Sequence, residues 1–262
     1  MTIVPPDTLI PGLDVPVMAI RDIIRDVARD EILSRYLKLS GAQISEKRPG
    51  EVVTEADVAA EIALANAIRA KVNNCLIVGE EGIEDTPDLM ERLDNDVPVF
   101  ILDPVDGTQN FANGQNRFAV IVAYRRNGET LAGWIHDPLS SVTCWAARNT
   151  GAYFDNGSAV IRHKGRDIES LKGCFGLRAQ TAMREKPDRK QPTLVPRYRC
   201  VGREYFDLVE RSRTSTNIAS YVGLNNVWRS VMGESFERPT PDQLEAMAKL
   251  VDQALAQLPE AA

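Results

Sequence analysis

Three stretches of the chain carry the spacing of amphipathic helices. In residues 17–39 apolar side chains recur at roughly i, i+3, i+4 and i+7, which places them on one face of a helix. A second helix is predicted for residues 54–71. Thr54 is a suitable N-cap there, and Asp57 three residues later nearly completes a capping box. A third helix is predicted near the end of the chain, where Thr240 precedes a periodic segment.

The middle of the chain follows a different pattern, with short runs of β-branched and aromatic residues between turn residues. Four such runs within residues 118–154 predict an antiparallel meander. The runs "CLIVGEE" and "PVFILDP" predict two earlier strands, and residues 41–54 predict a loop or a loose hairpin with Pro49 and Gly50 at its tip. Helices, then strands, then mixed elements favour an α+β fold built in layers.

Composition narrows the classes of function. The chain has 262 residues, of which 44% are hydrophobic and 26% charged, as in an ordinary globular protein. Its net charge of −6 gives no broad basic surface for nucleic acid or an anionic membrane, so we expect neither as a partner. No apolar run approaches the roughly 18 residues that cross a bilayer, and the first residues do not resemble a signal peptide. We therefore expect a cytoplasmic protein.

Cysteine and histidine usage bears on metal chemistry. The cysteines are scattered without a C-x-x-C pair, which argues against a structural zinc site and a disulfide framework. His136 and His163 are the only histidines, which nearly excludes a histidine-rich metal site. We therefore expect any metal site to rely mainly on oxygen ligands.

Acidic side chains follow apolar runs at three separate places: Asp57 in "EVVTEAD", Glu80 in "IVGEE", and Asp103 and Asp106 in "ILDPVDGTQNF". Taken singly, each has an ordinary explanation as a turn, a solvated pair or a first-turn helix residue. Taken together, they place carboxylates at element ends, where like charges repel unless a proton or a cation lies between them. Carboxylates and a backbone carbonyl suit Mg²⁺ or Mn²⁺ better than Zn²⁺. Pro104 has no N–H for a strand ladder and predicts a turn directly after Asp103, and Gly107 would permit a positive φ directly after the second aspartate.

These three motifs, in this order, closely resemble those of the inositol monophosphatase family of Mg²⁺-dependent phosphomonoesterases. The segments "GWIHDPL", "GAYFDNG" and "RCVGREYFDLV" are also similar to the family, so the resemblance covers about residues 17–209. It implies a layered αβαβα sandwich of the sugar-phosphatase type, one domain over residues 1–262, and a homodimer. Within that domain, residues 1–15 are expected to form an N-terminal arm and residues 211–262 a divergent C-terminal region.

The resemblance also implies a metal site. Glu80, Asp103 and the Val105 carbonyl would hold one Mg²⁺, with Mn²⁺ as a plausible substitute, and Asp106 with Asp103 would hold a second. Asp57 would lie in the outer shell or at a weaker third metal, with Lys47 nearby.

The remaining implied roles concern the substrate, a small phosphorylated metabolite. Thr108, with Glu80, would orient the attacking water. Asp106 would also contact the substrate, and the backbone N–H groups of Gly107 and Thr108 would donate to its phosphate. The resemblance therefore implies metal-dependent hydrolysis of a phosphate monoester.

The C-terminal region departs from the family. The family's last motif, W-D-x-A-A-G, supplies a further metal ligand, but at that spacing this chain has "VWRSVMGES" with Arg229 at the aspartate position. A guanidinium offers only donors, so Arg229 cannot bind Mg²⁺. Three readings stay open: Asp207 or Glu234 replaces the ligand, the second cation binds weakly, or the protein is catalytically impaired and binds a phosphorylated ligand or a protein partner. Arginine suits phosphate well, which keeps the last reading open.

Overall fold

The computed structural model describes residues 13–48, 51–85 and 96–155, together with positions 172–173, 184, 193–194, 200, 202, 240 and 242. Apart from Thr240 and Asp242, the predicted C-terminal helix lies outside the described residues, as do Arg229 and the segment "EYFDLVER". One short strand pair is also described, in which β9 (Lys172–Gly173) pairs in parallel with β10 (Thr193–Leu194).

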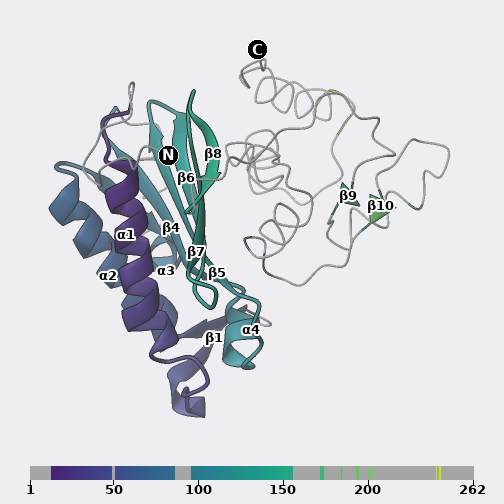
Figure 1. Ribbon diagram of the computed structural model, residues 1–262. Helices are drawn as coiled ribbons and strands as arrows, with labels where there is room; N and C mark the ends of the chain where they lie inside the picture. Colours follow the sequence, from purple (N-terminus) through teal and green to yellow (C-terminus); the bar gives the residue numbers. More distant parts are fainter. Residues whose placement is uncertain are drawn as a thin grey trace.

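A six-stranded sheet in the order β3-β4-β5-β6-β7-β8 forms the centre of the described fold (Figure 1). β3 and β4 are parallel, and every later neighbour is antiparallel, so the predicted meander within residues 118–154 is confirmed. The strands are β3 (Leu76–Gly79), β4 (Val99–Asp106), β5 (Ala119–Arg126), β6 (Glu129–Asp137), β7 (Val142–Ala147) and β8 (Gly151–Phe154).

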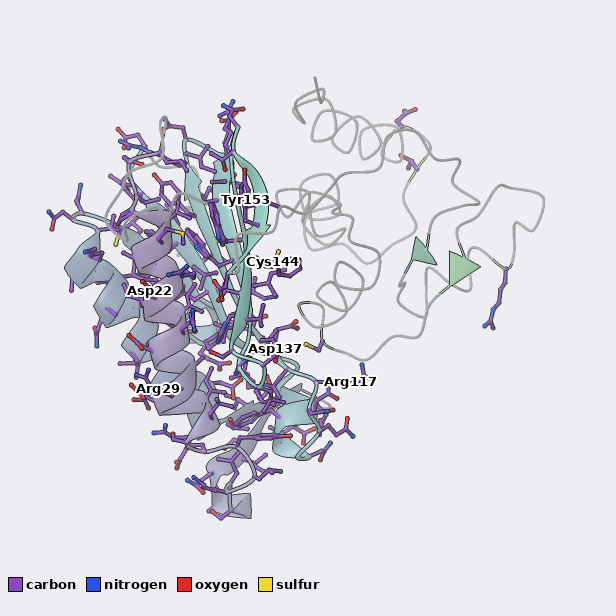
Figure 2. The ribbon with its side chains drawn as sticks, in the orientation of Figure 1. Asp22, Arg29, Arg117, Asp137, Cys144 and Tyr153 are labelled. Carbon is purple, nitrogen blue, oxygen red and sulfur yellow. The ribbon has the colours of Figure 1, made fainter. Side chains whose placement is uncertain are left out.

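Two long helices, α1 (Val17–Val27) and α2 (Glu55–Lys71), cover one face of this sheet (Figure 1). Their buried side chains share one core with alternate residues of the strands, including Ile20, Leu64 and Trp134. Each such buried apolar side chain contributes about 1.5–3 kcal/mol of transfer free energy, so this contact is the main source of stability here. Strand alternation sends Ile135 and Cys144 to the opposite face, and Figure 2 shows Cys144 on the side away from α1.

The first predicted helix is shorter than expected and less regular. α1 ends at Val27 and continues as a π-helix, Ala28–Leu33, after which residues 34–38 form turns. The Ser34 hydroxyl donates to the Asp30 carbonyl, and Leu37 adopts a positive φ, so the helical pattern cannot reach Leu39. The periodicity was right for the buried face but wrong for the end of the helix.

The hairpin and the second helix formed as predicted. β1 (Ile44–Arg48) and β2 (Glu51–Thr54) pair antiparallel after a short 3₁₀ turn at Gly41–Gln43. Thr54 caps α2, and a reciprocal capping box links Thr54 to Asp57. Two short helices, α3 (Glu80–Asp85) and α4 (Thr108–Ala112), follow β3 and β4 directly.

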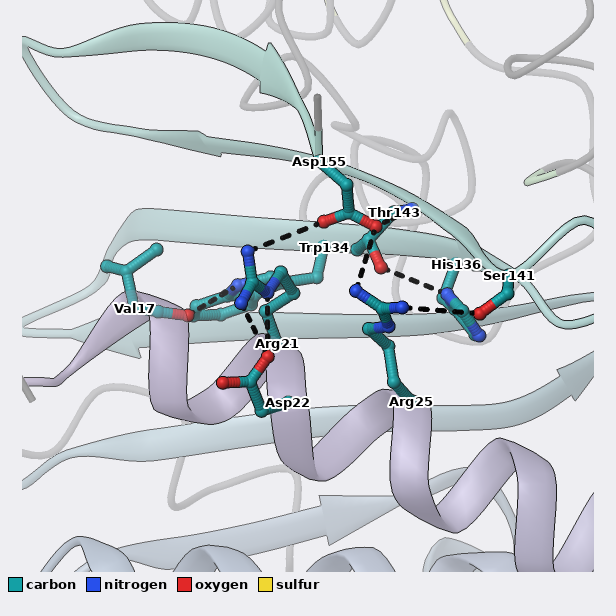
Figure 3. A network of polar contacts seen from close by, with 9 residues as sticks. All are labelled: Val17, Arg21, Asp22, Arg25, Trp134, His136, Ser141, Thr143 and Asp155. Carbon is teal, nitrogen blue, oxygen red and sulfur yellow. Dashed lines mark hydrogen bonds and ion pairs between the residues drawn. The ribbon is translucent and has the colours of Figure 1, made fainter. Parts of the chain in front are cut away.

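A polar network fastens α1 to the edge of the sheet (Figure 3). Arg21 and Arg25 form ion pairs of 3.7 and 3.6 Å with the two carboxylate oxygens of Asp155, which follows β8. Asp155 also accepts a hydrogen bond from the Thr143 backbone N–H at 2.8 Å. Behind it, the buried His136 ring meets the Thr143 hydroxyl at 3.0 Å. These contacts fix the position of the helical layer over β7 and β8.

The described fold is α+β, as predicted. It supplies one helical layer and one sheet of the expected αβαβα arrangement, and the remaining layers stay a prediction. None of the helices within the described ranges is long and apolar enough to span a bilayer.

Candidate metal centre

A β-bulge in β4 determines where the two aspartates point. Asp103 pairs with Ile121 and Asp106 with Ala119, so β4 has one more residue than β5 over this interval. In a regular strand, residues three apart lie on opposite faces. The extra residue brings Asp103 and Asp106 to the same face. We expected a turn directly after Asp103, and this was wrong: Pro104, which has no N–H to pair, is accommodated inside the bulge instead.

Gly107 ends the strand in the left-handed conformation that the sequence predicted, with φ of +93°. A side chain is also excluded by space, because a Cβ at this position would lie 2.8 Å from the carbonyl oxygen of Arg117. The Gly107 carbonyl accepts hydrogen bonds from Asn110 and Phe111, which start α4. Thr108 is therefore held at the first position of a helix, immediately beside the aspartates.

Asp57 is buried and held by two threonines. Its Oδ2 accepts from the Thr54 hydroxyl at 2.5 Å and from the Thr54 backbone N–H at 3.0 Å. Its Oδ1 lies 2.9 Å from the Thr108 hydroxyl, which is also 2.9 Å from the Val105 carbonyl oxygen. Burial raises the pKa of Asp57 to about 6 despite these hydrogen bonds. The predicted residues Asp57, Val105 and Thr108 thus meet at one point.

Glu80 and Asp103 meet at the carboxyl ends of parallel strands. Gly79 of β3 is in register with Leu102 of β4, so the next residue of each strand lies beside the other. Burial raises the pKa of Asp103 well above its usual range, and the nearby charges of Glu80 and Asp106 and a hydrogen bond to Glu80 raise it further. Asp103 Oδ1 is buried and has no hydrogen-bond partner. A proton or a cation must therefore sit among these carboxylates.

Glu81 lies next to this group, and Lys47 supplies a compensating positive charge. Its carboxylate pairs with the Lys47 ammonium at 2.5 Å, and both side chains are largely buried. Burial nevertheless raises the pKa of Glu81 to about 7, and Lys47 only partly opposes this shift. The expectation that Lys47 lies nearby is confirmed, although its partner is Glu81.

Several residues at the site were not predicted. The thiol of Cys200 lies 3.2 Å from the Asp106 carbonyl and 3.3 Å from its Oδ2, and the Gly202 backbone N–H also donates to that oxygen. Glu61 accepts hydrogen bonds at the start of α3. Cys200 and Gly202 belong to the segment "RCVGREYFDLV", which was noted for its similarity but not for any contact. For Glu61, the signal in the sequence was its place one helical turn after Asp57.

The donor set suits a hard divalent cation. Carboxylates from α2, α3 and β4 converge with a backbone carbonyl, and one buried carboxylate oxygen lacks a partner. Among the described residues, no three His, Cys, Asp or Glu side chains are already grouped closely enough to hold an ion. Glu80 and Asp103 instead share a hydrogen bond, as carboxylates do when a proton takes the place of a cation. The possible substitutes Asp207 and Glu234 lie outside the described residues.

Comparison with known proteins gives one consistent family. The profile of the "Inositol monophosphatase family" matches residues 19–211. A fructose-1,6-bisphosphatase/inositol-1-monophosphatase of Thermotoga maritima is 33% identical over 133 residues, which cover 50% of this chain and 48% of that protein. Nus factor SuhB of Escherichia coli is 31% identical over 159 residues, 61% of this chain and 55% of that protein. The chain thus spans about half the length of the curated relatives that it matches.

Solved structures share the fold. The extragenic suppressor protein suhB from Bartonella henselae superposes with a TM-score of 0.59 at 24% identity, covering 77% of this chain and 76% of that one. An IMPase from Thermotoga maritima gives a TM-score of 0.56 at 20% identity, covering 90% of this chain and 96% of that one. At such identities the likeness concerns the fold alone.

Proposed function

Because the chain belongs to the inositol monophosphatase family, we propose that it hydrolyses a small phosphate monoester with the help of a divalent cation, Mg²⁺ or Mn²⁺. The observation that carries the proposal is the convergence of Asp57, Glu80, Asp103 and Asp106 from three separate segments. Asp103, with its partnerless buried oxygen, lies at the centre of that group.

The assignment of ligands follows the placement of the residues. Glu80, Asp103 and the Val105 carbonyl are the proposed ligands of the first cation, and Asp106 joins Asp103 toward a second. When bound, such a cation supplies positive charge for the phosphoryl oxygens and lowers the pKa of water. This explains how a chain of net charge −6 would bind a phosphate dianion without a basic patch.

The protein's own groups would orient and accept protons. The Thr108 hydroxyl has two acceptors at 2.9 Å, Asp57 and the Val105 carbonyl, but only one proton to donate. Asp57 and the Val105 carbonyl therefore hold the Thr108 hydroxyl in place, and we assign to Thr108 and Glu80 the orientation of the attacking water. The backbone N–H groups of Gly107 and Thr108, at the start of α4, are assigned to the substrate phosphate.

The direct test is phosphate release from a panel of inositol, sugar and nucleotide phosphates while Mg²⁺ is titrated. Asp103→Asn should lower kcat at least about a hundredfold, because it removes the ligand shared by both cations. Asp26→Asn, an exposed aspartate on α1, is the control and should leave turnover unchanged. Metal-independent turnover, or full activity in Asp103→Asn, would sink the proposal.

One position of the sequence favours a second candidate function. Arg229 stands where the family has an aspartate, which suits a catalytically impaired protein that binds a phosphorylated ligand or a protein partner. Relatives from Escherichia coli and Vibrio cholerae bear the name Nus factor SuhB, which does not name a phosphatase. This candidate predicts that phosphate esters protect against unfolding without being hydrolysed. Turnover by the unmodified protein would refute it.

The remaining expectations stay predictions for the same experiments. They are a single domain over residues 1–262, a homodimer, a cytoplasmic location, and the absence of a nucleic-acid or membrane partner. Light scattering would measure the oligomeric state, and a filter-binding assay would measure affinity for RNA or DNA.

A further inference from the structure

Glu61 of α2 holds the backbone immediately after Glu80. Its Oε2 accepts from the Glu81 backbone N–H at 2.9 Å, and its Oε1 accepts from the Gly82 N–H at 3.0 Å. These amides belong to the first turn of α3, where N–H groups have no acceptor within the helix. A side chain from a different helix therefore provides the cap for α3.

Gly79 makes room for this contact. A Cβ at Gly79 would overlap the carboxyl group of Glu61, so the carboxylate sits where a side chain at position 79 would otherwise lie. Gly79 does not have a positive φ, so the need for glycine at this position is explained by the close approach of the Glu61 carboxylate and not by the backbone conformation. The absence of a side chain at Gly79 thus leaves the space that the Glu61 carboxylate occupies at the β3–α3 junction.

The junction determines where Glu80 points. Glu80 lies between Gly79, against which Glu61 packs, and the two amides that Glu61 accepts from. Its carboxylate reaches Asp103, the residue at the centre of the acidic group. Glu61 and Asp57 are four residues apart on α2. One helix therefore carries both the carboxylate that contacts Thr108 and the carboxylate that caps the helix beginning at Glu80.

We infer that Glu61 is a positioning residue: it fixes the start of α3 so that Glu80 is aimed at Asp103, and thereby sets the affinity of the centre for a divalent cation. The inference rests on the proposed function. Outer partners of metal ligands commonly change metal affinity by 10- to 100-fold, although they do not touch the metal.

Two variants separate position from charge. Glu61→Gln keeps the length of the side chain but loses one of the two acceptors. Gly79→Ala keeps the Glu61 charge but displaces its carboxylate. Gly41→Ala is the matched control, because a Cβ there meets nothing within 4 Å. For each protein, Mn²⁺ affinity is measured by calorimetry, Mg²⁺ half-activation by turnover, and amide hydrogen exchange at Glu81 and Gly82 by NMR without metal.

Both variants should weaken Mn²⁺ binding about tenfold, raise the Mg²⁺ concentration for half-activation similarly, and speed exchange at Glu81 and Gly82. Gly41→Ala should match the unmodified protein. If Gly79→Ala binds Mn²⁺ normally while Glu61→Gln does not, charge and not position is at work, and the inference is overturned. If the unmodified protein turns over substrate and both variants bind Mn²⁺ with unchanged affinity, the inference about Glu61 is overturned while the proposed function stands. An unmodified protein that neither binds Mn²⁺ nor turns over instead refutes the proposed function, and this inference with it.

Discussion

Replacing Asp57 by asparagine should stabilise the metal-free protein, and the gain should grow with pH. Asp57 is only 1% exposed, and burial raises its pKa from 3.8 to about 6. Since the folded pKa lies above the unfolded one, ionised Asp57 opposes folding, and stability is lost as pH rises from about 4 through 6. Raising the pKa of Asp57 from 3.8 to about 6 lowers the free energy of unfolding by about 3 kcal/mol above pH 7. At pH 4.5 the same change lowers it by about 1 kcal/mol.

An asparagine fits the contacts of Asp57. Its carbonyl oxygen can accept both Thr54 hydrogen bonds, and its NH₂ group can donate to the Thr108 hydroxyl, which then donates to the Val105 carbonyl. No buried polar atom of this set is left without a partner. The substitution therefore removes the charge without a new penalty.

The assay is urea unfolding in EDTA at pH 4.5 and pH 8, with Asp57→Asn compared with the unmodified protein at each pH. Glu55→Gln, an exposed carboxylate in the same helical turn, is the control and should change the free energy of unfolding by less than about 0.5 kcal/mol at both values. The reasoning is refuted if Asp57→Asn is destabilised equally at the two pH values. Turnover with Mg²⁺ should fall in the same variant, because Thr108 loses its carboxylate partner.

Three further perturbations test other parts of the structure. His136 is buried and its pKa is lowered from 6.5 to about 4, so stability should fall by up to about 3 kcal/mol as pH drops from 6.5 to 4. Urea titrations of His136→Gln should show no such fall in stability between pH 6.5 and pH 4. Gly107→Ala should cost about 2 kcal/mol or more in chemical unfolding and lower kcat, because of the positive φ and the close Arg117 carbonyl. Asp155→Asn should cost about 1 kcal/mol at low salt and less at 1 M NaCl, since it weakens ion pairs to α1.

Local patterns predicted much of the described fold. The alternation within residues 118–154 predicted the meander, because each strand buries one face under the helical layer. The spacing of Thr54 and Asp57 predicted the start of α2 and its capping box, since both depend on neighbours within one turn. These features need only short-range information.

Features that depend on a partner strand or on a distant residue were not predictable. The bulge in β4 exists only in relation to β5, so the sequence around Pro104 suggested a turn instead. The contacts of Glu61 with the start of α3 and of Cys200 with Asp106 join segments about 20 and 94 residues apart. The ion pair of Lys47 with Glu81 likewise joins β1 to α3 across the fold. Motif order predicted which residues act as ligands, and the fold shows how their side chains are held.

The most direct test of the account is a crystal structure of the protein soaked in Mn²⁺, with anomalous scattering used to locate the ion. The account predicts a peak between the carboxylates of Glu80, Asp103 and Asp106, beside the Val105 carbonyl, with the hydrogen bond between Glu80 and Asp103 broken. An ordered centre without a peak, and with that hydrogen bond intact at pH 8, would contradict it.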